Sequence, residues 1–288
     1  MRILLTGAKG QIGRAIRERL PEEWELIATD SKTLDITNRA AVLNMIAMFQ
    51  PDAIINSAAF TSVSLAENDL EKTFAVNAYG PRNLAEAAKE AKARFLHIST
   101  DFVFSGRLRI PYTEDNAPNP QSAYGQSKLA GELLTLAANP NSIVLRTSWV
   151  FGEHGENSVT TLLKQAANGE KVGLVDNQAA CPTYAGDLAD AIITLLQQPD
   201  YASGILHYSG NRAVSAYQFA QTVIQIERER NPDFVAPELE ALQLADIQPP
   251  SPRPRYSALN CDKARSLGLE ASDWKKKLPE VLAKLAAK

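Results

Sequence analysis

Short apolar runs alternate with longer segments of helical spacing along the first half of the chain. The runs typical of strands are RILL, ELIAT, AIIN, RFLHIS and SIVLR. The segments typical of helices are QIGRAIRERL, NRAAVLNMIAMF, a long stretch through FAVNAYGPRNLAEAAKEA, and YGQSKLAGELLTLAA. Strand and helix in turn indicate βαβ units, which build a parallel, doubly wound sheet. The sequence therefore predicts an α/β fold of the Rossmann-like type.

This regular alternation weakens after Arg146. GEKVGLV is typical of another strand, DLADAIITLLQQ and AYQFAQTVIQIERER of helices, and the proline-rich stretch QPPSPRPRY at 248–256 precedes a closing helix. We expect a nucleotide-binding domain over residues 1–148, to which residues 170–200 return. Residues 149–288 are then expected to form mainly a smaller C-terminal, substrate-binding lobe.

Charge and composition exclude several classes of partner. The 288 residues include 30 basic and 33 acidic ones, without a long run of either sign, so we expect no nucleic acid and no membrane as partner. The apolar run at the start of the chain is too short for a signal peptide, which predicts a cytoplasmic protein. Two distant cysteines and three dispersed histidines predict neither a disulfide framework nor a metal site.

A glycine-rich loop follows the first predicted strand. TGAKGQIG places Gly7, Gly10 and Gly13 where the first helix begins, so that the backbone can approach a pyrophosphate. The second predicted strand leads to Asp30, whose carboxylate can bind the ribose hydroxyls of a dinucleotide. Asp30 favours NADH because it repels a 2'-phosphate, whereas the neighbouring Lys32 can offset that repulsion. The cofactor is therefore predicted to be NADPH or NADH.

Tyr124 and Lys128 are neighbours at positions i and i+4 of a predicted helix. A free phenol has a pKa of about 10, and a nearby ammonium group lowers it. Such a pair is most often only an exposed helix face. Thr100, however, follows the strand RFLHIS at the edge where doubly wound sheets bind ligands. Its hydroxyl can then hydrogen-bond a substrate carbonyl that Tyr124 protonates while hydride arrives.

Ordered motifs along nearly the whole chain resemble the extended short-chain dehydrogenase/reductases and, among them, the dTDP-4-dehydrorhamnose reductase family. The matching stretches are TGAKGQIG, LDIT at 34–37, NSAAFTSV at 56–63, STDFVF with PYTEDNAPNPQSAYGQSKLAGE, RTSWVFG at 146–152, PTYAGDLA at 182–189 and RPRYSAL at 253–259. The resemblance implies an NAD(P)H-dependent oxidoreductase that reduces the 4-keto group of dTDP-4-dehydro-L-rhamnose to give dTDP-L-rhamnose. We then expect a small-molecule nucleotide sugar as the substrate, and a monomer or a homodimer as the oligomeric state.

The resemblance also implies roles for individual residues. The catalytic set is Thr100, Tyr124 and Lys128, with Tyr124 as proton donor to the sugar C4 oxygen. The cofactor-binding residues are Gly7, Gly10, Gln11, Ile12, Gly13, Asp30, Asp35, Ile36, Ala58, Ala59, Tyr124 and Lys128. The substrate-binding residues are Thr61, Val63, Thr100, Phe102, Trp149 and Arg253, and Asn77 orders the site. From the residues alone, Trp149 is equally compatible with a core aromatic, Asn77 with an exposed helix position, and Arg253 with a solvated loop.

Departures from the family pattern leave the substrate open. Val63–Glu67 reads VSLAE where the family commonly has VDKAE, Phe102 replaces a tyrosine, and NQAACPT at 177–183 replaces DQxGxPT. A related deoxysugar nucleotide is therefore an alternative substrate. Thr100 is followed by Asp101 and Phe102 rather than the Asp-Glu pair of dehydratases, which favours a reductase but also fits a redox-neutral epimerase. The third alternative is a cofactor-binding regulatory subunit resembling that of methionine adenosyltransferase.

Overall fold

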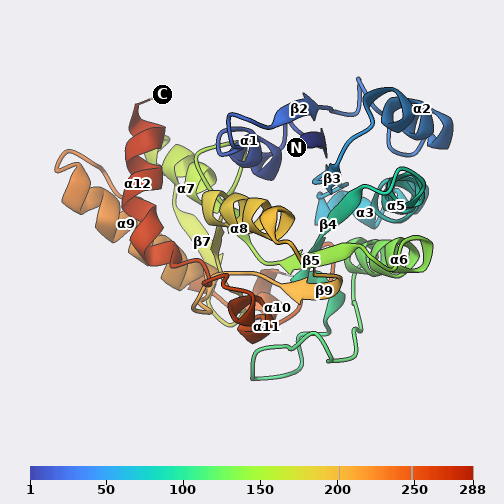
Figure 1. The fold of residues 1–288 in the computed structure, drawn as a ribbon. Coiled ribbons are helices and arrows are strands. Elements are labelled where there is room, and N and C mark those ends of the chain that lie inside the picture. Colours follow the sequence, from blue (N-terminus) through green and yellow to red (C-terminus); the bar gives the residue numbers. More distant parts are fainter. Residues whose placement is uncertain (201, 248, 288) are drawn as a thin grey trace.

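A parallel six-stranded sheet forms the centre of the molecule (Figure 1). The computed structural model describes residues 1–200, 202–247 and 249–287. In spatial order the strands are β2 (Glu25–Ala28), β1 (Arg2–Thr6), β3 (Ala53–Asn56), β4 (Arg94–Thr100), β5 (Ile143–Thr147) and β9 (Gly204–His207). The predicted α/β fold with a doubly wound parallel sheet is confirmed. The strand order reverses direction between β1 and β3, and such sheets bind ligands beyond the carboxyl ends of the strands at this point.

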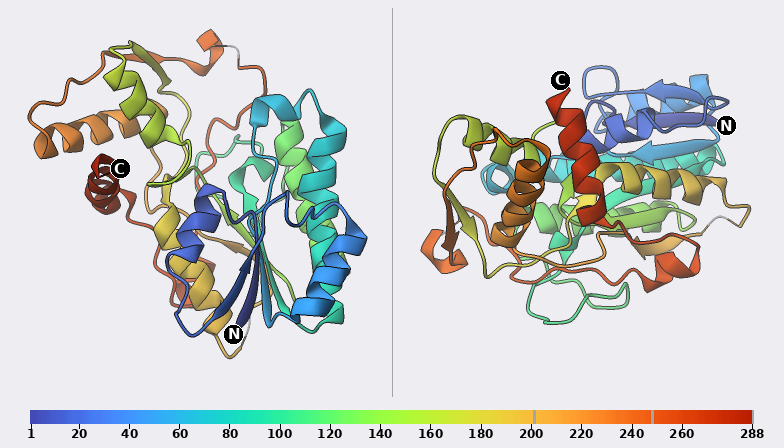
Figure 2. Two further views of the ribbon diagram at one scale, coloured as in Figure 1. Left: turned by 90° about the horizontal axis from the view of Figure 1, so that it is seen from above. Right: turned by 90° about the vertical axis from the view of Figure 1, so that its left-hand side faces the viewer.

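Helices cover both faces of the sheet (Figure 2). On one face lie α1 (Gln11–Arg17) and α8 (Ala185–Gln197), and on the other lie α2 (Arg39–Phe49), α5 (Gly80–Glu90) and α6 (Ala123–Ala138). Successive strand residues point to opposite faces. Thus Ile3 and Leu5 pack in the core with α1 and α8, while Leu4 packs in the core with α2 and α5. This two-sided burial explains why the strands read as continuous apolar runs.

A second group of elements lies beside the sheet, at the left of Figure 1. It comprises α7 (Ser158–Ala167), α9 (Ala216–Arg230), α12 (Trp274–Ala286), the parallel pair β7 (Val172–Val175) and β10 (Leu239–Leu242), and the short pair β6 (Val150–Phe151) and β8 (Thr183–Tyr184). These elements share a core that includes Phe151, Phe219 and Trp274. The domain limits at 148 and 149 stay a prediction.

The long predicted helix through FAVNAYGPRNLAEAAKEA is interrupted. It consists of α4 (Leu70–Phe74), a π-helical turn η1 (Ala75–Tyr79) and α5. Such turns are frequent at functional sites. Here α6 packs closely on η1, because a Cβ added to Gly131 of α6 would lie 2.1 Å from the Asn77 carbonyl oxygen.

Short elements complete the described chain. They are α3 (Val63–Ala66), the 3-10 turn η2 (Asp101–Val103), α10 (Leu244–Ile247) and α11 (Asp262–Ser266). The α6 helix begins after Ser122, whose side chain accepts a hydrogen bond from the Gly125 amide. Within the described ranges, no helix has the length and apolar character that a membrane crossing requires.

Candidate active site

A cavity of about 820 Å³ opens at the carboxyl ends of the central strands. It extends from the glycine loop after β1, past the segment after β3, to the ends of β4 and β5. Of the eighteen residues predicted as catalytic, cofactor-binding or substrate-binding, seventeen line this cavity, and Arg253 is the exception. They are Gly7, Gly10, Gln11, Ile12, Gly13, Asp30, Asp35, Ile36, Ala58, Ala59, Thr61, Val63, Thr100, Phe102, Tyr124, Lys128 and Trp149.

Two glycines of the loop are required by close backbone packing. Gly7 has φ +68°, and a Cβ there would lie 2.6 Å from the Ala58 amide nitrogen. A Cβ on Gly13 would lie 2.4 Å from the Gly7 carbonyl oxygen. The loop can therefore adopt its tight path only without side chains at these positions, and it leaves its backbone open to a ligand at the start of α1.

Asp30 is paired with a lysine that the sequence analysis did not single out. The Lys9 ammonium forms an ion pair with Asp30, and the backbone amides of Lys32 and Thr33 each donate to Asp30 Oδ1 at 3.0 Å. The bond from Lys9 is the main reason why the pKa of Asp30 lies far below its ordinary value. The lysine that offsets the negative charge of Asp30 is therefore Lys9 of the glycine loop, and not Lys32 as predicted.

Thr100 and Tyr124 both line the part of the cavity at the carboxyl end of β4. Thr100 Oγ1 lies 3.1 Å from Asp101 Oδ1, and the Thr100 side chain also hydrogen-bonds Tyr124. The Tyr124 ring packs edge-on against Phe102, with centroids 5.6 Å apart. Burial raises the pKa of Tyr124 to about 12, while the Thr100 hydrogen bond opposes the rise. The phenol is thus held in its protonated form.

Lys128 does not lower the pKa of Tyr124 as the sequence analysis expected. Its Nζ atom donates to the Ile98 carbonyl oxygen at 2.6 Å and lies 3.3 Å from His97 Nε2. Desolvation of the phenol therefore dominates over the attraction that was predicted from helical spacing. Burial also lowers the pKa of Lys128 to about 8, and the Glu132 carboxylate opposes that change.

Asp101 is a buried carboxyl group that sequence reasoning noted only by its place after Thr100. Its Oδ2 accepts hydrogen bonds from Ser257 at 2.5 Å and from Ser148 at 2.9 Å. Burial raises the pKa of Asp101, and these two hydrogen bonds oppose the rise. The carboxyl group therefore holds the Thr100 hydroxyl at the cavity wall and links it to the segment around residue 257.

Asn77 and Trp149 have different surroundings in the structure. Asn77 is fully buried rather than exposed, and its side-chain amide donates to the Phe60 carbonyl at 3.0 Å and to Ser127 Oγ at 3.0 Å. Trp149 lines the cavity and also packs on Phe219, with centroids 5.0 Å apart. Asn77 thus connects the loop after β3 with α6, and Trp149 belongs to both a core cluster and the cavity wall.

Arg253 lies in a second cavity of about 810 Å³. Three further arginines line this second cavity, namely Arg107, Arg109 and Arg255. The chain passes from Phe102 in the first cavity to Ser105 in the second within one short segment. Four guanidinium groups around one cavity favour an anionic ligand such as a phosphate.

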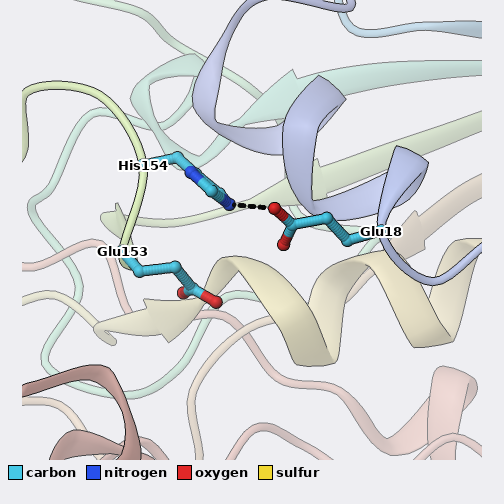
Figure 3. A group of neighbouring side chains, drawn as sticks. All are labelled: Glu18, Glu153 and His154. Atoms are coloured by element: carbon cyan, nitrogen blue, oxygen red, sulfur yellow. Dashed lines mark ion pairs between the residues drawn. The ribbon is translucent and has the colours of Figure 1, made fainter. Parts of the chain in front are cut away.

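One group of described residues has the composition of a metal site (Figure 3). Ligand atoms of Glu18, Glu153 and His154 lie within 4.8 Å of one another. However, His154 Nε2 pairs with Glu18 at 2.7 Å, and Glu153 accepts from Lys284 at 2.9 Å and from the Tyr184 hydroxyl at 3.1 Å. These ion pairs account for the group as a connection between α1, the segment after β6, and α12, so we assign no metal to it.

Comparisons with known proteins agree with this geometry. Residues 1–287 match the family described as RmlD substrate binding domain. The chain is 38% identical to a dTDP-4-dehydrorhamnose reductase of Aggregatibacter actinomycetemcomitans, over 98% of both chains. It is also 38% identical to a probable dTDP-4,6-dihydroxy-2-methyloxan-3-one 4-ketoreductase of Streptomyces antibioticus, over 100% of this chain and 96% of that one. A crystal structure of dTDP-4-dehydrorhamnose reductase from Bacillus anthracis in complex with NADP superposes with a TM-score of 0.92 at 30% identity, covering 98% of this chain and 99% of that one.

Proposed function

The chain belongs to the RmlD substrate binding domain family, and on that premise we propose that it is an NAD(P)H-dependent reductase of the 4-keto group of dTDP-4-dehydro-L-rhamnose, which yields dTDP-L-rhamnose. The observation that carries the proposal is the single cavity in which the glycine loop and the Thr100–Tyr124 pair face the same space. We further propose that the protein works in the cytoplasm as a monomer or a homodimer.

The first cavity fits a nicotinamide dinucleotide, because it runs from the glycine loop at the start of α1 to Thr100 and Tyr124, and Gly7, Gly10 and Gly13 line it. The bound cofactor supplies the hydride. Residues of this chain bind and orient it: the loop faces the pyrophosphate, and Asp30 with Lys9 lies where the second strand of such a sheet meets the adenosine ribose. The remaining proposed cofactor contacts are Gly10, Gln11, Ile12, Asp35, Ile36, Ala58, Ala59, Tyr124 and Lys128.

Tyr124 is the proposed general acid. Its pKa of about 12 keeps the phenol protonated at neutral pH, so it can donate to the C4 oxygen as negative charge develops there. Thr100 Oγ1 donates to Asp101 Oδ1 in the structure, so its hydroxyl proton turns from Asp101 to the same C4 oxygen when the substrate binds.

The sugar and its diphosphate extend from the first cavity toward the second. Thr61, Val63, Phe102 and Trp149 line the first cavity and are the proposed contacts of the sugar ring. Arg253 is the proposed contact of the diphosphate, because it is one of four arginines that line the second cavity and a guanidinium group can donate two parallel hydrogen bonds to phosphate oxygens.

Tyr124→Phe tests the assignment of the acid. Since positioned general acids contribute about 10²–10⁴-fold, we expect turnover of dTDP-4-dehydro-L-rhamnose to fall by that factor. Binding of NADPH, measured by fluorescence titration, should stay nearly unchanged because only one hydroxyl is removed. Wild-type turnover in the variant would contradict the role of Tyr124.

A related 4-ketosugar nucleotide is a second candidate substrate. The Streptomyces antibioticus relative, named as a 4-ketoreductase of a different dTDP-sugar, is as similar to this chain as the rhamnose enzyme is. Phe102 also brings no hydroxyl to the cavity. A comparison of kcat/KM for dTDP-4-dehydro-L-rhamnose and for other dTDP-4-ketosugars distinguishes the two, because the cognate substrate gives the higher value.

A further inference from the structure

A chain of buried polar groups lies behind Lys128. Lys128 Nζ is 3.3 Å from His97 Nε2, and His97 Nδ1 is 2.9 Å from Asn56 Nδ2. Asn56 Oδ1 accepts from Thr6 Oγ1 at 2.6 Å and from the Ala58 amide at 3.1 Å. His97 and Asn56 are fully buried, and Lys128 is 2% exposed. Water therefore has little access to these contacts.

The backbone fixes the direction of the hydrogen bonds in this chain. The Ala58 N–H can only donate, so the Asn56 oxygen faces it and the Asn56 NH₂ faces His97 Nδ1. His97 Nδ1 must then accept. An accepting Nδ1 excludes the doubly protonated ring, and burial lowers the pKa of His97 well below its ordinary value, so the ring is neutral. Its single proton is consequently on Nε2, which faces Lys128.

An N–H group on His97 Nε2 matches the amine form of Lys128 and not the ammonium form. The amine has a lone pair that can accept from Nε2–H, while its own hydrogens still reach the Ile98 carbonyl at 2.6 Å. An ammonium group has no lone pair. An ammonium group could donate to Nε2 only if one of two changes occurred. Either the Asn56 amide would flip, so that its NH₂ group faced the Ala58 N–H, or the ring proton would lie on Nδ1, where it would face the Asn56 NH₂ group. We propose that Asn56 and His97 are positioning residues that present a ring N–H to Lys128 and stabilise its unprotonated amine.

The other ionisable groups around α6 do not replace this contact. Glu132, one turn beyond Lys128, is held by Arg146 at 2.7 Å, and Asp101 is held by two serines. In the helices α4 and α5 packed on α6, the charged side chains are exposed, except Glu86, which pairs with surface arginines. In the part of the chain that the structure describes, His97 and the Ile98 carbonyl are therefore the polar groups at Lys128 Nζ.

The role of Asn56 and His97 in the reaction rests on the proposed function. Lys128 lines the same cavity as Thr100 and Tyr124. Stabilising its amine form brings the pKa of Lys128 toward neutral pH, so the positive charge that Lys128 presents to the cavity, and with it turnover, should decrease as the pH rises above neutrality.

The ring proton can be located by nuclear magnetic resonance on protein labelled with ¹⁵N-histidine. Two-bond ¹H–¹⁵N correlations distinguish the protonated ring nitrogen from the unprotonated one. The chain has three histidines, so the signals of His97 are identified by their loss in His97→Gln. We expect the neutral tautomer with the proton on Nε2 at neutral pH. A proton on Nδ1, or a doubly protonated ring, would overturn the proposal whatever the activity of the enzyme.

Two variants test the link from Asn56 to Lys128. Asn56→Asp keeps the oxygen that accepts from Thr6 and Ala58 but replaces the NH₂ group, which faces His97 Nδ1, with a second acceptor oxygen. The ring proton should therefore move to Nδ1. The alkaline limb of kcat/KM against pH should then rise by about one pH unit or more. Thr6→Val is the matched control, since Ala58 still orients the amide and the Nε2 proton should remain. An unmoved ring proton in Asn56→Asp, or a moved proton with an unmoved pH profile, would refute the link.

Discussion

The ion pair of Glu132 and Arg146 is buried beneath the proposed catalytic helix. Both side chains are 1% exposed, and Glu132 accepts three hydrogen bonds: from Arg146 Nη2 at 2.7 Å, from Arg146 Nε at 2.9 Å and from Ser99 Oγ at 2.5 Å. Glu132→Gln keeps the volume but replaces one acceptor oxygen by an NH₂ group. The new NH₂ group must then face a hydrogen-bond donor of Arg146 or Ser99, because both Glu132 oxygens accept from these residues. The positive charge of Arg146 also loses its counter-charge.

Removing one partner of a buried pair costs about 3–5 kcal/mol, and we expect Glu132→Gln to lose that much free energy of unfolding. Equilibrium urea unfolding followed by circular dichroism measures the loss. Glu86→Gln is the matched control, because Glu86 pairs with Arg82 and Arg39 near the surface and such pairs contribute about 0–1 kcal/mol.

The double variant Glu132→Leu with Arg146→Met should recover most of the lost stability, since apolar side chains of similar volume leave no buried charge. A loss below about 1 kcal/mol in Glu132→Gln would refute the reasoning. So would a double variant that is less stable than the single one.

Three further substitutions test the cofactor and substrate contacts. Gly13→Ala places a Cβ 2.4 Å from the Gly7 carbonyl, and fluorescence titration should show cofactor affinity reduced by more than about tenfold. Lys9→Ala leaves Asp30 unopposed, so the ratio of kcat/KM for NADPH to that for NADH should fall by about tenfold; an unchanged ratio contradicts the role of the pair. Arg253→Ala removes a charge-assisted bond to the diphosphate, so steady-state kinetics should show a KM for the nucleotide sugar raised about tenfold or more and a kcat nearly unchanged.

Apolar patterns in the sequence predicted those strands and helices whose own residues are buried in a regular pattern. Strands buried on both faces give continuous apolar runs, and this pattern located β1, β3, β4 and β5. The edge strand β2 was located by a similar apolar run, although its residues are only partly buried or exposed. The pattern gave no signal for β9, because GILH is only four residues long and joins the sheet through its pairing with β5. The π-helical turn η1 was also missed, since its apolar residues continue a helical pattern and the interruption lies where α6 packs at Gly131.

The site was predictable where its residues belong to motifs near strand ends. It was not predictable where two distant segments meet. Lys9 reaches Asp30 because β1 and β2 are adjacent in the sheet, which the order of elements along the chain does not specify. His97 reads as one position in an apolar strand, and only the packing of α6 on β4 brings Lys128 to it. The prediction that Lys128 lowers the pKa of Tyr124 was wrong, because the pKa is raised by burial of the phenol and helical spacing does not indicate how deeply a side chain is buried.

The most direct test of the proposed reaction follows the hydride itself. The purified protein is incubated with dTDP-4-dehydro-L-rhamnose and NADPH that carries deuterium at the transferred position of the nicotinamide. If the chain is a 4-ketoreductase, magnetic resonance and mass spectrometry will find one deuterium at C4 of dTDP-L-rhamnose for each NADPH oxidised. Product without deuterium, or an epimerised sugar formed without oxidation of NADPH, would contradict the account.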